Sequence, residues 1–319
     1  MIFDSYLAWA ALAGAMFALI GVAYRMGKPR NLLPIHIVPF IALCGTVVFV
    51  VRTAGIDWSA VPFRVWVLGV TVGPTQYLAF TLIALALRMG PLVPVWCAVS
   101  MGFLPVAVYS ALGLHETVNA WQLLGLGGAI ACVVAASFEG RQQPSADTAS
   151  RPGGVLRQTL YAVILGLVVV FNGFTGVAVK DLAAQSLEGP TMLKAFGDVY
   201  FLLLYAGLTA CVFVDLAVTR RFRMIHRGVW LPALIGGIGS VGGILSTARY
   251  ADGPGMTVFA VSGICGIFAT TALAWFLFRE KLTAARTASV LLGCLAIVLY
   301  AAGGTGAPRS NGPNDKPAL

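Results

Sequence analysis

The sequence predicts an all-α polytopic membrane protein with ten transmembrane helices, arranged as two inverted five-helix repeats. Hydrophobic residues make up 59% of the 319 residues and charged residues only 10%, whereas about a quarter of the residues of a soluble domain are charged. The apolar residues fall in runs of about 20, the length of a helix that spans a bilayer. A long segment, from Ala84 to Ser137, also returns in similar form from Thr247 to Gly303.

The first half of the chain contains five apolar runs, separated by polar or Gly- and Pro-containing corners. They predict helices over residues 5–24, 33–51, 63–87, 91–112 and 119–138. The first run lacks the basic start and the cleavage site of a signal peptide, so we expect it to be retained as a helix. These helices form the first repeat, residues 1–138, and a polar linker rich in Pro, Ser and Gly follows at residues 139–155.

The second half repeats this plan. Its apolar runs predict helices over residues 156–179, 190–219, 228–248, 254–278 and 284–302, which form the second repeat, residues 156–303. Residues 304–319 contain no apolar run and predict a disordered, solvated tail. Because each repeat has an odd number of helices, the second must lie upside down relative to the first, as in many secondary transporters.

The two repeats also agree in local features. Each copy of the long segment has Gly-Pro, an apolar run containing Ala-Val-Ser, and a corner with one glutamate, Glu116 or Glu280. We expect these glutamates to stabilise the N-terminus of the helix that follows each of them. Glycine pairs four residues apart allow helix backbones to approach closely in lipid. One such pair occurs in each repeat, at Gly69 and Gly73 and at Gly239 and Gly243.

The chain resembles the drug/metabolite transporter superfamily, specifically its ten-helix proteins with two EamA-type repeats. The resemblance is strongest around His115-Glu116-Thr117 and Arg279-Glu280-Lys281-Leu282-Thr283, each followed by a Gly-rich helix. It implies a multi-pass carrier of the bacterial inner membrane, usually an exporter, for small metabolites, amino acids or drugs.

Basic residues are distributed unequally between the two sides of the membrane. If the helices alternate in direction, 14 Lys and Arg residues lie on one side and 7 on the other, which also holds the termini. The positive-inside rule then predicts both termini outside. The family resemblance implies both termini in the cytoplasm. A C-terminal reporter that is active only in the cytoplasm distinguishes these two expectations.

Charged and titratable side chains within the apolar runs are candidates for a substrate site, because each is costly in a bilayer. Lys194 and Asp198 stand four residues apart, within reach of one another on one helix. Either this pair faces a cavity, where it binds an ionic or zwitterionic substrate or takes part in proton coupling, or it neutralises itself near the helix end. His36 has a comparable place in the second helix, where it either exchanges protons or is only hydrogen-bonded.

Amides and aromatic side chains add further candidates. Pro74, in the third helix, removes a backbone hydrogen bond, so we expect that helix to open beside Gln76 and Tyr77. A packing kink is the alternative. Asn172 lies at a similar depth in the sixth helix, where it either faces substrate or bonds two helices together. Two aromatic residues either shape an apolar pocket or belong to the interfacial belt. They are Trp9 and Trp96.

Several other classes of protein are not indicated. The net charge of +9 comes from Lys and Arg at the ends of apolar runs, where they contact lipid headgroups, so we expect no nucleic-acid partner. The six cysteines stand singly in apolar runs, which indicates neither disulfides nor a metal site. No HExxH, GxSxG, P-loop or dinucleotide motif occurs in a suitable context. We therefore expect neither an enzyme nor a cofactor.

The leading hypothesis is a secondary transporter that moves a small molecule by alternating access. Its cavity is predicted between helices one, two, three, six, seven and eight, with the last two helices of each repeat bracing the halves or forming a homodimer interface. The rival hypothesis is a membrane scaffold or accessory subunit, which requires a closed interior and a stable protein partner. A membrane-embedded enzyme is a third option.

Overall fold

The computed structural model describes residues 2–27, 32, 34–89, 92–139, 154–187, 190–219, 227–279 and 284–303. This part of the chain is helical apart from turns and one isolated β-bridge between Ser186 and Thr191. Most of the expected linker, the expected tail and the corner that contains Glu280 lie outside the described residues. The helices are α1 (Ile2–Gly27), α2 (Pro34–Arg52), η2 (Trp58–Ala60), α3 (Phe63–Met89), α4 (Leu92–Ser100), α5 (Phe103–Leu112), α6 (Ala120–Glu139), α7 (Gly154–Ala184), α8 (Met192–Thr219), η4 (Arg227–Val229), α9 (Trp230–Tyr250), α10 (Gly255–Phe278) and α11 (Ala284–Ala302).

Helix occupies each range in which the sequence predicts it, with ends shifted by a few residues. The range 91–112 differs, because it holds two helices, α4 and α5, instead of one. Conversely, α3 runs without interruption through Pro74, so the expectation that this proline opens the third helix is wrong.

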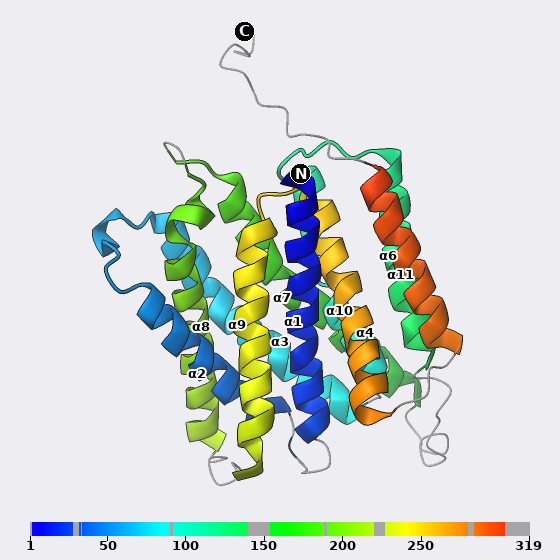
Figure 1. Cartoon of the computed structure of the whole chain (residues 1–319). Coiled ribbons are helices and arrows are strands. Elements are labelled where there is room, and N and C mark those ends of the chain that lie inside the picture. Colours follow the sequence, from blue (N-terminus) through cyan, green and yellow to red (C-terminus); the bar gives the residue numbers. More distant parts are fainter. Residues whose placement is uncertain are drawn as a thin grey trace, which may run out of the picture.

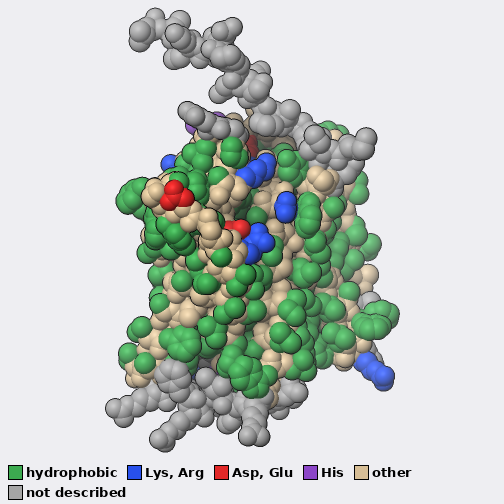
Figure 2. All heavy atoms as spheres, turned by 60° about the vertical axis from the view of Figure 1, so that its left-hand side comes forward, with side chains coloured by type: hydrophobic (Ala, Val, Ile, Leu, Met, Phe, Trp, Pro, Cys, Tyr) green, Lys and Arg blue, Asp and Glu red, His purple; other side chains and the backbone are tan. Residues whose placement is uncertain are grey.

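The surface of the helical bundle is apolar. On the face seen in Figure 2, hydrophobic side chains cover most of the surface, and most of the charged side chains gather in the upper part. Phe63, Val218 and Phe276 are each more than 75% exposed, which would be unfavourable in water but matches lipid. By length and composition, seven helices of the described part are able to cross a membrane, and three shorter apolar helices accompany them. The protein is therefore a multi-pass helical membrane protein.

Two groups of helices face one another at the centre of the molecule. The α1 bundle consists of α1 and the two helices that pack against it, α9 and α10. The α7 bundle consists of α7 and the helices that pack against it, α3, α4 and α5. Of the other helices, α2 packs against α8 and α9, α3 also packs against α8, and α6 packs against α11. In Figure 1, α2 and α8 lie at the left and α6 and α11 at the right.

The glycine pairs allow close helix packing, as predicted. A Cβ atom added to Gly73 would lie 2.7 Å from the carbonyl oxygen of Leu204 in α8. One added to Gly239 would lie 2.6 Å from the carbonyl oxygen of Met16 in α1. Both distances are shorter than van der Waals contact, so no larger residue fits between these backbones.

Both ends of the helical chain lie on one side of the bundle. α1 begins and α11 ends at the same end, which we call the upper end, as seen in Figure 1. The lower end is the one at which α1 stops and α2 begins.

Candidate substrate cavity

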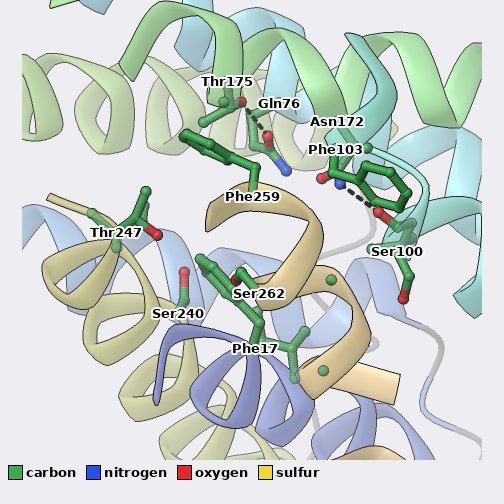
Figure 3. A pocket seen from close by; sticks show the side chains of 18 of the residues that line it. Phe17, Gln76, Ser100, Phe103, Asn172, Thr175, Ser240, Thr247, Phe259 and Ser262 are labelled. Carbon is green, nitrogen blue, oxygen red and sulfur yellow. Dashed lines mark hydrogen bonds between the residues drawn. The ribbon is translucent and has the colours of Figure 1, made fainter. Parts of the chain in front are cut away.

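A cavity of about 220 Å³ lies between the α1 bundle and the α7 bundle. Its lining comes from every helix of both bundles and from α8. Figure 3 shows the polar side chains of the α7 bundle on one side and those of the α1 bundle on the other. The prediction that the second helix lines the cavity is wrong, because no described side chain of α2 is among the lining residues. Helices four and nine, which we expected to brace the halves, line the cavity as α4, α5 and α10.

Two amide side chains form the polar part of the α7-bundle side. The hydroxyl of Thr175 donates to the side-chain oxygen of Gln76 at 2.7 Å. The amide nitrogen of Asn172, one turn before Thr175 in α7, donates to the carbonyl oxygen of Val99 at 3.0 Å. Because these bonds join α7 to α3 and to α4, they position both amides at the cavity (Figure 3).

The break between α4 and α5 supplies the carbonyl that Asn172 binds. Pro105 has no N–H group to continue the hydrogen bonding of α4 into α5. The N–H of Gly102 donates to the carbonyl of Val99 at 3.1 Å, which gives a tight turn instead of a helical bond. A Cβ atom on Gly173 would lie 2.7 Å from the carbonyl oxygen of Gly102, so α7 packs directly against this break.

Small hydroxyl residues form much of the α1-bundle side. Ser262 in α10 lines the cavity on this side, and Ser100 at the end of α4 lines it from the α7 bundle. These are the serines of the two Ala-Val-Ser sequences. The hydroxyl of Ser240 in α9 is 2.6 Å from that of Tyr205 in α8. Thr247 donates to the carbonyl of Gly243 within its own helix at 2.9 Å.

Towards the lower end, Trp96 joins the two bundles. This side chain lies one turn into α4, and its indole N–H donates to the hydroxyl of Thr270 in α10 at 3.3 Å. A Cβ atom on Gly21 of α1 would lie 2.8 Å from the indole ring. Tyr24 meets the same ring edge-on, with centroids 5.9 Å apart. The indole therefore contacts both α1 and α10.

At the upper end, an ion pair of the α7 bundle forms hydrogen bonds with the start of α10. Lys180, near the end of α7, is 4% exposed and lies 2.7 Å from the Glu116 carboxylate. Its ammonium group also donates to the carbonyl of Gly253 at 2.6 Å. The second carboxylate oxygen of Glu116 accepts from the N–H of Gly255 at 2.9 Å. Glu116 therefore stabilises the N-terminus of α10 and not, as we expected, that of the helix following it.

A second network strengthens the α7 bundle itself. Arg64 in α3 donates two hydrogen bonds to the carboxylate of Asp181 in α7, at 2.9 and 2.7 Å. Tyr109 in α5 donates a further, short hydrogen bond to the same carboxylate. One carboxylate thus connects three helices of this bundle.

The predicted site residues divide into two groups. Gln76, Asn172 and Trp96 line the cavity. The other five are not among its lining residues; they are His36, Tyr77, Lys194, Asp198 and Trp9. Among these, His36 is buried and Trp9 is 39% exposed.

The expected mutual pairing of Lys194 and Asp198 is wrong. Lys194 pairs with Asp252 at the corner between α9 and α10. Asp198 pairs with Arg52 at the end of α2, at 2.9 Å. Both pairs lie at the upper end, where each residue finds a partner from another segment that is better placed than its neighbour on α8.

Sequence reasoning missed Lys180, Asp181 and Arg64 as parts of the two ion-pair networks. Their positions at the ends of apolar runs were visible, but their partners come from segments distant in the chain. Within the described residues, no group of three or more His, Cys, Asp or Glu side chains is arranged to hold a metal ion.

Comparison with known proteins gives a likeness of fold. No family model and no curated protein sequence matches the chain. Among solved structures, 27 chains match. One is a crystal structure of a protein that superposes with a TM-score of 0.70 over 93% of this chain and 96% of the other, at 15% sequence identity. The helical fold is therefore shared with a known structure over nearly the whole chain.

Proposed function

We propose that this chain is a secondary transporter of the drug/metabolite transporter type, with ten spans in two inverted repeats, in a bacterial inner membrane. The main support is the central cavity, which lies between two helix bundles inside a protein with an apolar outer surface. Such a cavity, at the interface between related helix groups, is typical of secondary transporters.

The packing of the helices supports the inverted repeat. If the sixth to tenth expected helices correspond to the first to fifth, α7 is the counterpart of α1. α1 packs against α9 and α10, and α7 packs against their counterparts α3 and α4–α5. The pairs α2–α8, α5–α10 and α6–α11 each join a helix to its own counterpart. This matching is the pattern that a twofold axis between the two repeats would produce, and an odd number of helices in each repeat would place that axis in the membrane plane.

The contacts at both ends of the cavity support alternating access. At the upper end, Lys180 and Glu116 hold the start of α10. At the lower end, Trp96 holds α1 and α10. We propose that one set of contacts breaks while the other remains, so that the cavity opens to one side at a time. An ion or solute gradient supplies the drive.

The rival hypothesis of a membrane scaffold requires a closed, well-packed interior. The bundle instead has a cavity of about 220 Å³ at its centre, which does not meet that requirement. We therefore retain transport as the proposed function.

Flux in proteoliposomes tests the proposal. The full chain is reconstituted, and the release of radiolabelled amino acids, sugars, nucleosides, uncharged heteroaromatics and cationic drugs is followed. Gln76→Trp fills the cavity from α3 and should lower the flux of the transported solute about tenfold or more. Val70→Trp is the matched control, because Val70 lies on the same helix with its side chain 54% exposed at the outer surface. Flux of none of these solutes, or equal flux in Gln76→Trp and Val70→Trp, would reject the proposal.

A further inference from the structure

The cavity lining is aromatic and uncharged. Among the described residues that line the cavity, eight are aromatic, and none is a Lys, Arg, Asp or Glu. The eight are Phe17, Phe80, Trp96, Phe103, Phe201, Tyr205, Tyr250 and Phe259. A solute with a full charge would lose its hydration here without gaining a counter-charge, which is strongly unfavourable. The lining therefore selects against ions and zwitterions.

The buried charges of Lys180 and Asp181 do not supply that counter-charge. Lys180 is held by Glu116 and by the carbonyl of Gly253. Asp181 is held by Arg64 and Tyr109. Each charge is thus neutralised within its own cluster, and none of the four charged side chains belongs to the lining.

The two amides offer one hydrogen-bond donor and one acceptor to a ligand. The oxygen of Gln76 is occupied by Thr175 and the nitrogen of Asn172 by Val99. The NH₂ group of Gln76 and the side-chain oxygen of Asn172 remain, and no hydrogen bond of either to a described residue is observed. Thr175 and Asn172 are one helical turn apart, so this donor and this acceptor lie close together (Figure 3). They complement a ligand that has an acceptor beside a donor, as in a carboxamide or the amide edge of a heteroaromatic ring.

The volume of the cavity fits a small ligand with such an amide group. A cavity of about 220 Å³ is smaller than the roughly 300–1,000 Å³ of pockets for drug-sized ligands, which fits a single aromatic ring with one substituent or a small fused ring. Flat rings also suit a lining of aromatic side chains, because they stack or meet edge-on.

We infer that the cavity binds uncharged, planar heteroaromatic amides about the size of one substituted ring. Gln76 and Asn172 recognise the amide group of the ligand by hydrogen bonds. This inference rests on the proposed function, since it assigns a substrate class to the proposed transport site. Gln76 donates to the ligand oxygen, Asn172 accepts from the ligand N–H, and the aromatic lining encloses the ring.

Nicotinamide and nicotinate test the inference, because they differ in charge but have the same ring and nearly the same size. Binding of each to the purified full-length protein is measured by titration calorimetry. We expect nicotinamide to bind and nicotinate to bind about a hundredfold more weakly, the penalty of an unpaired buried charge. Equal binding of the two, or tighter binding of nicotinate or of a zwitterionic amino acid, would overturn the inference.

A variant of Gln76 tests whether the amide side chains bind the ligand. Gln76→Met keeps nearly the same size but loses the NH₂ donor without adding a charge, so nicotinamide should bind about tenfold more weakly, as expected for one buried hydrogen bond. Thr71→Val is the control, because Thr71 lies on α3 with an exposed side chain that bonds only within its own helix. Circular dichroism establishes that both variants are folded. Unchanged affinity in Gln76→Met would overturn the assignment.

Flux separates the failure of this inference from that of the proposed function. Nicotinamide that binds but does not cross the membrane, in a protein that moves none of the other solutes, rejects transport and keeps the ligand class. Flux of a charged solute that Gln76→Trp abolishes keeps transport and rejects the ligand class.

Discussion

The ammonium group of Lys180 is held at the upper end of the cavity by three acceptors, the Glu116 carboxylate and the carbonyls of Gly253 and Ala251. A buried charge that loses its partner is strongly destabilising, whereas a buried pair that is replaced as a unit often costs little. The stability of this end therefore depends on whether the pair is complete, more than on either residue alone.

Glu116→Gln should lower the free energy of unfolding by about 3 kcal/mol, because it leaves the Lys180 charge buried without a carboxylate. The double variant Lys180→Met with Glu116→Gln should recover most of this loss. Denaturant unfolding of the protein in detergent measures both. Asp198→Asn serves as control, since it breaks an exposed pair with Arg52 and should cost about 1 kcal/mol or less. Equal effects of Glu116→Gln and Asp198→Asn would contradict this view of Lys180.

Which individual residues form the site was predictable only in part. Gln76 and Asn172 stand out in the sequence because polar groups are rare in apolar runs, and both line the cavity. Lys194 and Asp198 satisfy the same criterion, but they lie near the start of α8, where partners from α2 and the α9–α10 corner bind them. Sequence spacing shows which residues are able to meet on one helix, whereas the choice of partner depends on the tertiary packing.

At the scale of helices, close approach of backbones determines how the α1 bundle is built. A Cβ atom on Gly14 of α1 would overlap the backbone around Ser262 and Gly266 of α10. By contrast, a Cβ atom on Gly166 of α7 would meet nothing within 4 Å. These two helical glycines therefore differ only in what surrounds them.

Gly14→Ala should destabilise the protein by about 1–3 kcal/mol, because α1 and α10 must move apart. Gly166→Ala should be neutral or stabilising by up to about 1 kcal/mol, because alanine is the better helix former. Thermal unfolding of the two variants in the same detergent measures the difference. A Gly14→Ala protein as stable as Gly166→Ala would show that α1 and α10 are not packed as described.

The helices were easier to predict than their breaks. Long apolar runs between polar corners define nearly all helix ends to within a few residues. Pro74 and Pro105 look alike in the sequence, but α3 continues through Pro74, whereas the chain breaks just before Pro105. The difference arises from Gly102 and from Asn172 of a distant helix, which bind the carbonyl of Val99 at the break. No local pattern contains that information.

At the scale of the whole molecule, the two ends differ in the number of basic residues. Four of the basic residues at the upper end form ion pairs with carboxylates, namely Arg52, Arg64, Lys180 and Lys194. The sequence places 14 Lys and Arg residues in the segments at the lower end and only 7 at the upper end. By the positive-inside rule, this difference in number favours the lower end as the cytoplasmic one.

This orientation predicts that a phosphatase reporter active only outside the cytoplasm is active when fused to the C-terminus. The same reporter inserted into the linker at residues 140–153 should be inactive. Enzyme activity in intact cells measures both fusions. The opposite result would place the termini in the cytoplasm, as the family resemblance implies.

Alternating access is the central claim, and distances between spin labels at the two ends of the cavity test it most directly. With the native cysteines replaced, one pair of labels on Ala8 and Ala184 spans the α1 and α7 bundles at the upper end, and another on Arg88 and Leu231 spans them at the lower end. The account predicts two populations at each end, with ligand or an ion gradient shifting the two distances in opposite directions. A single distance at each end, unchanged by nicotinamide, by the other solutes of the flux panel and by a proton or sodium gradient, would contradict it.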